Sequence, residues 1–96
     1  MIKKNSQSLG EILDEFIKSQ HLDGKLYETR LINAYPEIVG SGISSHTKNL
    51  YIKDGILYIS FDSSVIRNEM QLMRQSLISR LNGHIGHDII REIIFR

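Results

Sequence analysis

Alternating apolar and polar residues from Thr47 to Ser64 predict two β-strands joined by a tight turn. Asp54-Gly55 separates the two runs, and this pair favours a two-residue type I′ turn because both central residues take positive φ. Such a turn fixes the register of the hairpin. The predicted cross-strand pairs are Lys53 with Ile56, Ile52 with Leu57, Tyr51 with Tyr58, Leu50 with Ile59, and Lys48 with Phe61.

The two faces of this hairpin differ in polarity, because side chains alternate between faces along a strand. One face is apolar and consists of Leu50, Ile52, Leu57, Ile59 and Phe61. The other is more polar and carries Thr47, Asn49, Tyr51, Lys53, Ile56, Tyr58, Ser60 and Asp62. An isolated hairpin is only marginally stable in water, so we expect helices to cover the apolar face.

Before the hairpin, apolar residues recur at helical spacing in two segments. Residues 1–7 are polar, and we expect a flexible N-terminus there. Ser8 to Glu11 matches a capping box, which predicts a helix that ends before Gly24. The apolar positions of this first helix are Leu9, Ile12, Leu13, Phe16 and Ile17.

The second helical segment contains a proline. Its apolar side consists of Leu26, Leu31, Ala34 and Tyr35. Because proline lacks an amide hydrogen and disfavours helical geometry in the residue before it, Pro36 predicts a break or kink at Tyr35. A short helix from Pro36 to about Ser44 would follow and bury Ile38, Val39 and Ile43.

After the hairpin, Ser63 or Ser64 is positioned to cap a long helix from Val65 to about Asn82, and Gly83 is suited to end it. The apolar stripe of this helix consists of Ile66, Met70, Met73, Leu77 and Leu81, and it is predicted to pack on the apolar face of the hairpin. Residues 91–96 then read as a strand that pairs with one edge of the hairpin, with Ile93 and Phe95 facing inward.

These elements predict an α+β fold in the order helix, kinked helix, strand, strand, helix, strand. The sheet has three strands and the helices pack on one face of it. A chain of 96 residues has room for one core, so we expect a single domain over residues 8–96. With no cysteine, no apolar leader and no stretch long enough to span a membrane, the sequence is typical of a cytoplasmic protein.

Several short runs, in this order and spacing, resemble the DciA-like family, which was long catalogued as a domain of unknown function. The runs are Tyr35 to Gly40, His46-Thr47, Asp54 to Ile59, Asp62 to Ser64, Leu81-Asn82 with Gly86, and Ile93 to Arg96. The resemblance implies a KH-like fold. It also implies a bacterial operator or loader of the replicative helicase that binds DNA and this helicase and is not an enzyme.

The net charge of +1 neither requires nor excludes a polyanionic partner. From Thr47 onward there are seven Lys/Arg against five Asp/Glu, so the small positive excess lies in the second half. Arg67, Gln71 and Arg74 would share the outer side of the long helix. Phosphate attraction needs several cations on one surface, and this set is small.

Two other sets of residues are candidates for binding nucleic acid. Lys48 and Lys53 flank Tyr51 and Tyr58, as in the stacking platforms of single-strand binders, although a solvated sheet face with an aromatic pair fits the same pattern. The run Gly83 to Gly86 matches the Gly-x-x-Gly loop of KH domains. A helix end followed by a loop explains the same two glycines.

The remaining polar residues do not form an active site or a metal site in the sequence. His84, His87 and the adjacent Asp88 supply too few committed ligands for zinc, and no cofactor motif is present. Two classes of function therefore remain open. The first is a nucleic-acid-binding replication accessory, with single-stranded or duplex DNA and the replicative helicase as partners. The second is a protein-interaction adaptor without affinity for nucleic acid.

Overall fold

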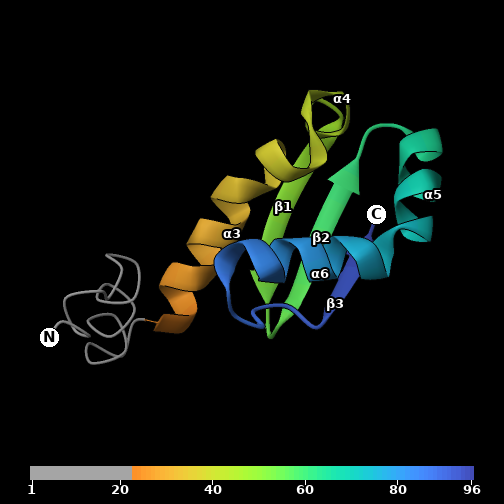
Figure 1. Ribbon diagram of the computed structural model, residues 1–96. Helices are drawn as coiled ribbons and strands as arrows, with labels where there is room; N and C mark the ends of the chain where they lie inside the picture. The colour runs from red at the N-terminus through yellow and green to blue at the C-terminus, as the bar shows by residue number, and fades with distance from the viewer. Residues whose placement is uncertain (1–22) are drawn as a thin grey trace, which may run out of the picture.

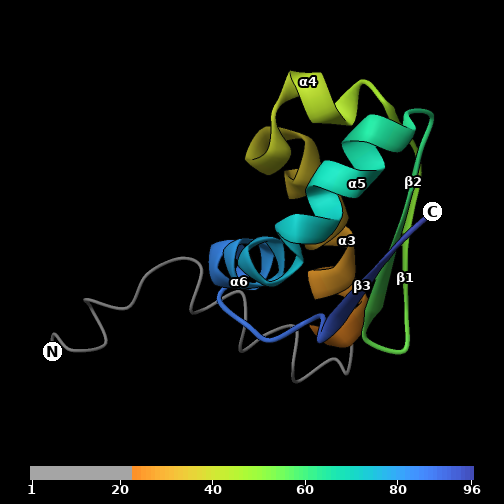
Figure 2. The same ribbon diagram turned by 90° about the vertical axis from the view of Figure 1, so that its right-hand side faces the viewer.

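A three-stranded mixed sheet forms one layer of the computed structural model, which describes residues 23–96 (Figure 1). Its strands are β1 (Thr47–Lys53), β2 (Ile56–Phe61) and β3 (Glu92–Phe95), in the spatial order β1-β2-β3. Strand β1 is antiparallel to β2, and β3 is parallel to β2. Figure 2 shows all the described helices on one side of this sheet. The predicted α+β class is therefore confirmed.

The hairpin has the predicted turn and most of the predicted register. Asp54 and Gly55 have φ values of 54° and 77°, as a type I′ turn requires. The four pairs nearest the turn form as predicted, but the pairing of Lys48 with Phe61 is wrong. A bulge between Thr47 and Asn49 places Thr47 opposite Phe61 instead.

The bulge turns Thr47 toward the helices, although the alternation predicts it on the outer face. Its hydroxyl donates its one hydrogen to the Ile43 carbonyl at 3.0 Å. The Tyr35 hydroxyl is therefore the donor in the 2.9 Å hydrogen bond between Tyr35 and Thr47. Tyr35 is buried, and this partner satisfies its hydroxyl.

The helix before the hairpin does not break at Tyr35. Helix α3 (Asp23–Val39) runs through Pro36. Gly40, whose φ is 89°, separates it from the short α4 (Ser41–Ser44). Tyr35 is 1% exposed. We attribute its helical conformation to this burial and to the hydrogen bond with Thr47, which together outweigh the cost of the following proline.

The predicted long helix is divided into α5 (Ser64–Leu72) and α6 (Arg74–Ile85). Ser63 caps α5 as predicted, because its side chain accepts a hydrogen bond from the Ile66 amide. Met73 lies at the junction with non-helical backbone angles. Helix α5 packs on β2 and β3, whereas α6 packs on α3 and β3, so one straight helix would not reach both sets of partners.

The end of α6 also differs from the prediction. Gly83 lies inside the helix, and Gly86 ends it with a left-handed φ of 87°. Asn82 then fixes the following segment: its side-chain oxygen accepts the amides of Ile89 and Ile90 at 3.0 and 3.1 Å, and its amide donates to the Ile90 carbonyl at 2.8 Å.

One apolar cluster joins the sheet to the helices. Within the predicted stripe, Met73 is the exception at 45% exposure, because it lies at the junction between helices. Ile93 is buried and Phe95 packs against the cluster, so the inward face of β3 is as predicted. The fully buried side chains are Leu31, Tyr35, Leu57, Ile59, Leu77, Leu81 and Ile93.

The predictions for residues 1–7 and for the helix that begins at the capping box of Ser8 and Glu11 lie outside the described residues. Within residues 23–96, no helix combines the length and the apolar character that a membrane crossing requires.

Candidate nucleic-acid interface

The outer face of the sheet, opposite the helices, carries a row of three stacked side chains. The rings of Tyr51 and Tyr58 stack with their centroids 4.8 Å apart and an interplanar angle of 12°. The guanidinium carbon of Arg96 lies 4.9 Å from the Tyr58 centroid, and its Nη1 is 3.4 Å from the Tyr51 hydroxyl. A cation over a tyrosine face is a favourable contact, so Arg96 extends the predicted aromatic pair.

This arrangement determines which ring surface is available to a base. Tyr51 and Tyr58 cover one face of each other, and Arg96 contacts both tyrosines, at the Tyr58 ring and at the Tyr51 hydroxyl. Tyr51 lies on the outer strand of the sheet and is 38% exposed. A base can therefore stack on the face of Tyr51 that is turned away from Tyr58. Ile94, which is 37% exposed and opposite Tyr58, adds an apolar contact on the same face.

The two candidate lysines of the hairpin are in different electrostatic settings. Lys48 Nζ is 3.5 Å from a carboxylate oxygen of Asp62, and the other oxygen is 2.8 Å from His46 Nδ1. The hydrogen bond from His46, together with the nearby positive charges, lowers the pKa of Asp62. Lys53 makes no ion pair with any residue in 23–96. Of the two, Lys53 is therefore freer to contact a phosphate.

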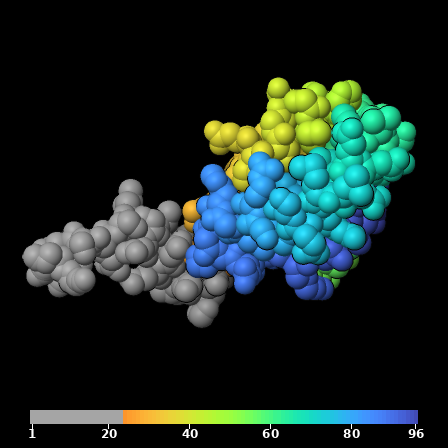
Figure 3. All heavy atoms as spheres, turned by 45° about the vertical axis from the view of Figure 1, so that its right-hand side comes forward, coloured from red at the N-terminus to blue at the C-terminus, as the bar shows by residue number. Residues whose placement is uncertain are grey.

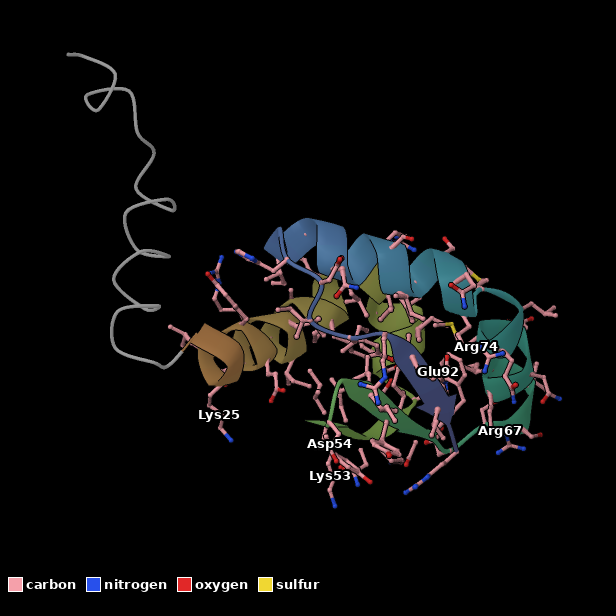
Figure 4. All side chains as sticks on the ribbon, turned by 90° about the horizontal axis from the view of Figure 1, so that it is seen from below. Lys25, Lys53, Asp54, Arg67, Arg74 and Glu92 are labelled. Atoms are coloured by element: carbon pink, nitrogen blue, oxygen red, sulfur yellow. The ribbon has the colours of Figure 1, made fainter. Side chains whose placement is uncertain are left out.

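The predicted cationic face of the long helix is divided by the break at Met73. Arg67 lies on α5 and Arg74 begins α6, and Figure 4 shows both near β3. Arg74 Nε is 3.8 Å from a carboxylate oxygen of Glu92, whereas Arg67 has no acidic partner among the described residues. The structure thus brings the two arginines to the same side of the molecule but pairs one of them.

The Gly83 to Gly86 run occupies the last turn of α6 and its cap. Beside it is a depression of about 590 Å³ that both glycines line together with His87 and Asp88. No lysine or arginine from residues 23–96 lines this depression, and a phosphate gains little beside an aspartate. His87 stacks on Tyr27 with centroids 4.2 Å apart, so it supports the fold of this loop.

Arg96 is a candidate that the sequence pattern does not reveal. The pattern predicts a last strand at one edge of the hairpin, but it does not say which edge. The backbone of Arg96 bonds to Ile59 and Phe61 of β2, which brings its side chain to Tyr58. The parallel pairing of β3 with β2 places Arg96 there, and the residues of the last strand do not specify this pairing.

A second surface lies on the helical side. Three large apolar residues around α5 are unusually exposed: Val65 at 65%, Leu72 at 88% and Met73 at 45%. Figure 3 shows this side, where α4, α5 and α6 meet. A groove of about 170 Å³ lies there and is lined by Val39, Ile43, Glu69, Met70, Met73, Leu77 and Arg80.

Comparison with known proteins identifies the family. The family model described as Dna[CI] antecedent, DciA, matches residues 8–95. This chain belongs to the DciA family. The match covers nearly the whole sequence and confirms the resemblance drawn from the short motifs.

Among curated proteins, the chain is similar to UPF0232 proteins from species of Mycobacterium and Corynebacterium. It is 21% identical to one from Mycobacterium tuberculosis over 90 residues, and these residues cover 94% of this chain and 48% of the relative. It is 26% identical to one from Corynebacterium glutamicum, with 94% and 51% covered. The chain therefore spans about half the length of the curated relatives it matches. No solved structure matches it.

Proposed function

We propose that this DciA-family chain is a non-enzymatic accessory protein of DNA replication that binds single-stranded DNA on the outer face of its sheet. The stacked row of Tyr51, Tyr58 and Arg96 carries this proposal. An exposed tyrosine ring on this face can stack on a base, and the arginine beside it can attract a phosphate. Single-strand binders use this combination. Lys53, at the end of β1, adds a second positive charge.

A titration of a fluorescent single-stranded oligonucleotide tests the platform. Replacing Tyr51 and Tyr58 by alanine removes both rings, and we expect affinity to fall about tenfold or more, since base stacking contributes about 1–3 kcal/mol per base. The matched control replaces both tyrosines by phenylalanine, which keeps the rings and loses only the hydroxyls. Equal affinity in the alanine and phenylalanine variants, with both folded, would rule out stacking on this face.

The family also supports a protein partner, the replicative helicase. We propose that the chain acts as an operator or loader of this helicase, as its membership of the DciA family implies. Co-elution of the purified chain with the hexameric helicase from the same organism tests this part. If the two proteins elute separately at micromolar concentrations with and without single-stranded DNA, the helicase role is contradicted while the DNA-binding role stands.

The second candidate is a protein-interaction adaptor without affinity for nucleic acid. Two observations favour it: Leu72 and Val65 of α5 are exposed, and a groove with apolar lining residues lies where α5 and α6 meet. Exposed apolar surface of this kind marks protein contacts. A pull-down from native cells, with and without nuclease, separates the two functions. Partners that resist nuclease and are lost with Leu72→Ser favour the adaptor, whereas partners lost with nuclease favour the DNA-binding accessory.

A further inference from the structure

One edge of strand β1 runs alongside α3 and pairs with no strand from residues 23–96. The other edge pairs with β2, because the described sheet has the order β1-β2-β3. In an antiparallel hairpin closed by a two-residue turn, Lys53, Tyr51 and Asn49 direct their backbone groups at β2. The backbone groups of the alternate residues, Leu50 and Ile52, therefore point outward at the free edge.

These outward groups are not taken up by another strand among the described residues. The Leu50 amide is bonded at 3.0 Å to the side-chain oxygen of its neighbour Asn49, an exposed contact that a competing acceptor can replace. No described side chain or loop bonds to the backbone of Ile52 at this edge. Unpaired groups at strand spacing are a template for a further strand.

The space beside the edge is hollow along the strand. One hollow of about 250 Å³ lies between Leu50 to Ile52 and the α3 segment from Lys25 to Ile32. A second, of about 210 Å³, continues it past Lys48 to Pro36 of α3 and shares Leu50 with the first. Figure 1 shows α3 following β1 along this edge. A helix beside a free strand edge is the geometry in which peptides are bound by strand addition.

The charges around these hollows favour an acidic occupant. Lys25 on α3 and Lys53 at the end of β1 project in the same direction in Figure 4, and neither has an ion pair among residues 23–96. Lys48 lines the second hollow and is paired with Asp62 at 3.5 Å. Glu28 lines the first hollow, so the three lysines outnumber the two nearby carboxylates by one, and the unpaired positive charge comes from Lys25 and Lys53.

We propose that the β1 edge binds an extended acidic segment of a partner protein, which adds to the sheet as a fourth strand. A peptide supplies N–H and C=O groups at the spacing of Leu50 and Ile52, which a nucleic acid backbone does not. The partly buried Ile32, Leu50 and Ile52 give alternate apolar side chains of the peptide a surface to contact. Alternate acidic side chains meet Lys25 and Lys53.

A second copy of this chain fits the same edge less well. Pairing two β1 edges would bring Lys25, Lys48 and Lys53 of both copies to one interface, and lysines at a strand edge oppose such self-association. An acidic peptide instead neutralises this charge.

Titration of the full chain with a fluorescein-labelled peptide of seven alternating valines and glutamates tests the proposal. We expect saturable binding and at least about tenfold slower hydrogen exchange at the Ile52 amide. For either direction of the added strand, the alternating side chains leave one alternate set of peptide amides facing β1. N-methylation of one set should therefore abolish binding, and N-methylation of the other set should leave it nearly unchanged. Equal loss with both sets, or no binding at millimolar peptide, would overturn strand addition.

A charge variant separates the acidic preference from the backbone contacts. Lys25→Glu should weaken peptide binding about fivefold, because it reverses a charge that lines the first hollow beside β1. The control, Arg67→Glu, makes the same change on α5 and should have little effect. Equal binding by wild-type protein and Lys25→Glu would contradict an acidic partner.

Two further outcomes would assign the edge to another occupant and overturn the proposal. One is a concentration-dependent dimer in which the Ile52 amide is protected without peptide. The other is protection of this amide by a single-stranded oligonucleotide. The peptide titration contains neither DNA nor helicase, so its failure would leave the replication role intact.

Discussion

At the scale of single residues, Asn82 holds the chain between α6 and β3 in place. It makes three hydrogen bonds to the backbone of Ile89 and Ile90, and Ile90 is 2% exposed. Asn82→Ala leaves buried backbone groups without partners, so we expect it to lower the free energy of unfolding by about 2–3 kcal/mol in a urea titration. Asn68→Ala, an exposed change of the same type on α5, should cost much less. Similar losses in the two variants would contradict this role.

Tyr35 gives the fold a dependence on alkaline pH. Burial raises the pKa of its phenol above 10.0, and this effect exceeds the opposing effect of the Thr47 hydrogen bond. A raised pKa in the folded state stabilises the protein below the pKa of the unfolded tyrosine, and this stabilisation is lost as pH rises through the higher folded value. Tyr35→Phe should be about 1 kcal/mol less stable at pH 7 because the hydrogen bond is lost.

The difference in the free energy of unfolding between wild-type protein and Tyr35→Phe should shrink above pH 10. Urea titrations at several pH values measure this difference. The other tyrosines titrate in both proteins, so the change in the difference reports Tyr35 alone. A constant difference from pH 7 to pH 11 would show that the phenol has the same pKa in the folded and unfolded states.

At the scale of elements, the end of α6 distinguishes two glycines that look equivalent in the sequence. Gly83 is helical, and an added Cβ there meets no atom within 4 Å, so Gly83→Ala should stabilise the protein by about 0.5–1 kcal/mol. Gly86 has a φ of 87°, so Gly86→Ala should destabilise it by about 1 kcal/mol. Thermal unfolding measures both effects. If both variants instead lost affinity for single-stranded DNA and did not show these opposite changes in stability, the result would favour a phosphate-clamping loop.

The sequence predicts the elements well where local chemistry decides them. Asp54-Gly55 determines the turn, and Ser63 caps α5 as expected from its side chain. The errors arise where distant residues decide. Neither glycine nor proline marks the break at Met73, which the different partners of α5 and α6 require. The bulge beside Lys48 accompanies the contact between Thr47 and Tyr35 of α3.

The candidate site follows the same division. The Tyr51 and Tyr58 pair comes from the register of one hairpin, so the sequence is sufficient to predict it. Arg96 joins the pair only through the order of strands in the sheet, which no local pattern specifies. The acidic partners of Lys48 and Arg74 likewise come from outside the helix or strand that carries each cation.

At the scale of the whole molecule, the surface separates into regions of different chemistry. The outer sheet face carries the aromatic row, and the helical side carries the exposed Leu72 and the apolar groove. Many cations of the described chain are engaged within it: Lys48 and Arg74 in ion pairs, and Arg80 and Arg91 with backbone carbonyls. Few positive charges of residues 23–96 therefore remain for phosphates.

This scarcity sets the salt dependence of DNA binding. Lys53, Arg67 and Arg96 have no acidic partner among residues 23–96. Arg96 lies at the Tyr58 ring on the outer sheet face, Lys53 ends β1, and Figure 4 shows Arg67 on the side of the molecule that carries β3. If they neutralise about two or three phosphates of a single strand, the logarithm of the binding constant should fall with the logarithm of salt concentration with a slope of about −2. Titrations at several salt concentrations measure this slope, and Lys53→Gln should make it shallower by about 0.7. A slope steeper than about −4 would mean that cations beyond these three, from a second copy or from the rest of the chain, contact the strand together with the aromatic row.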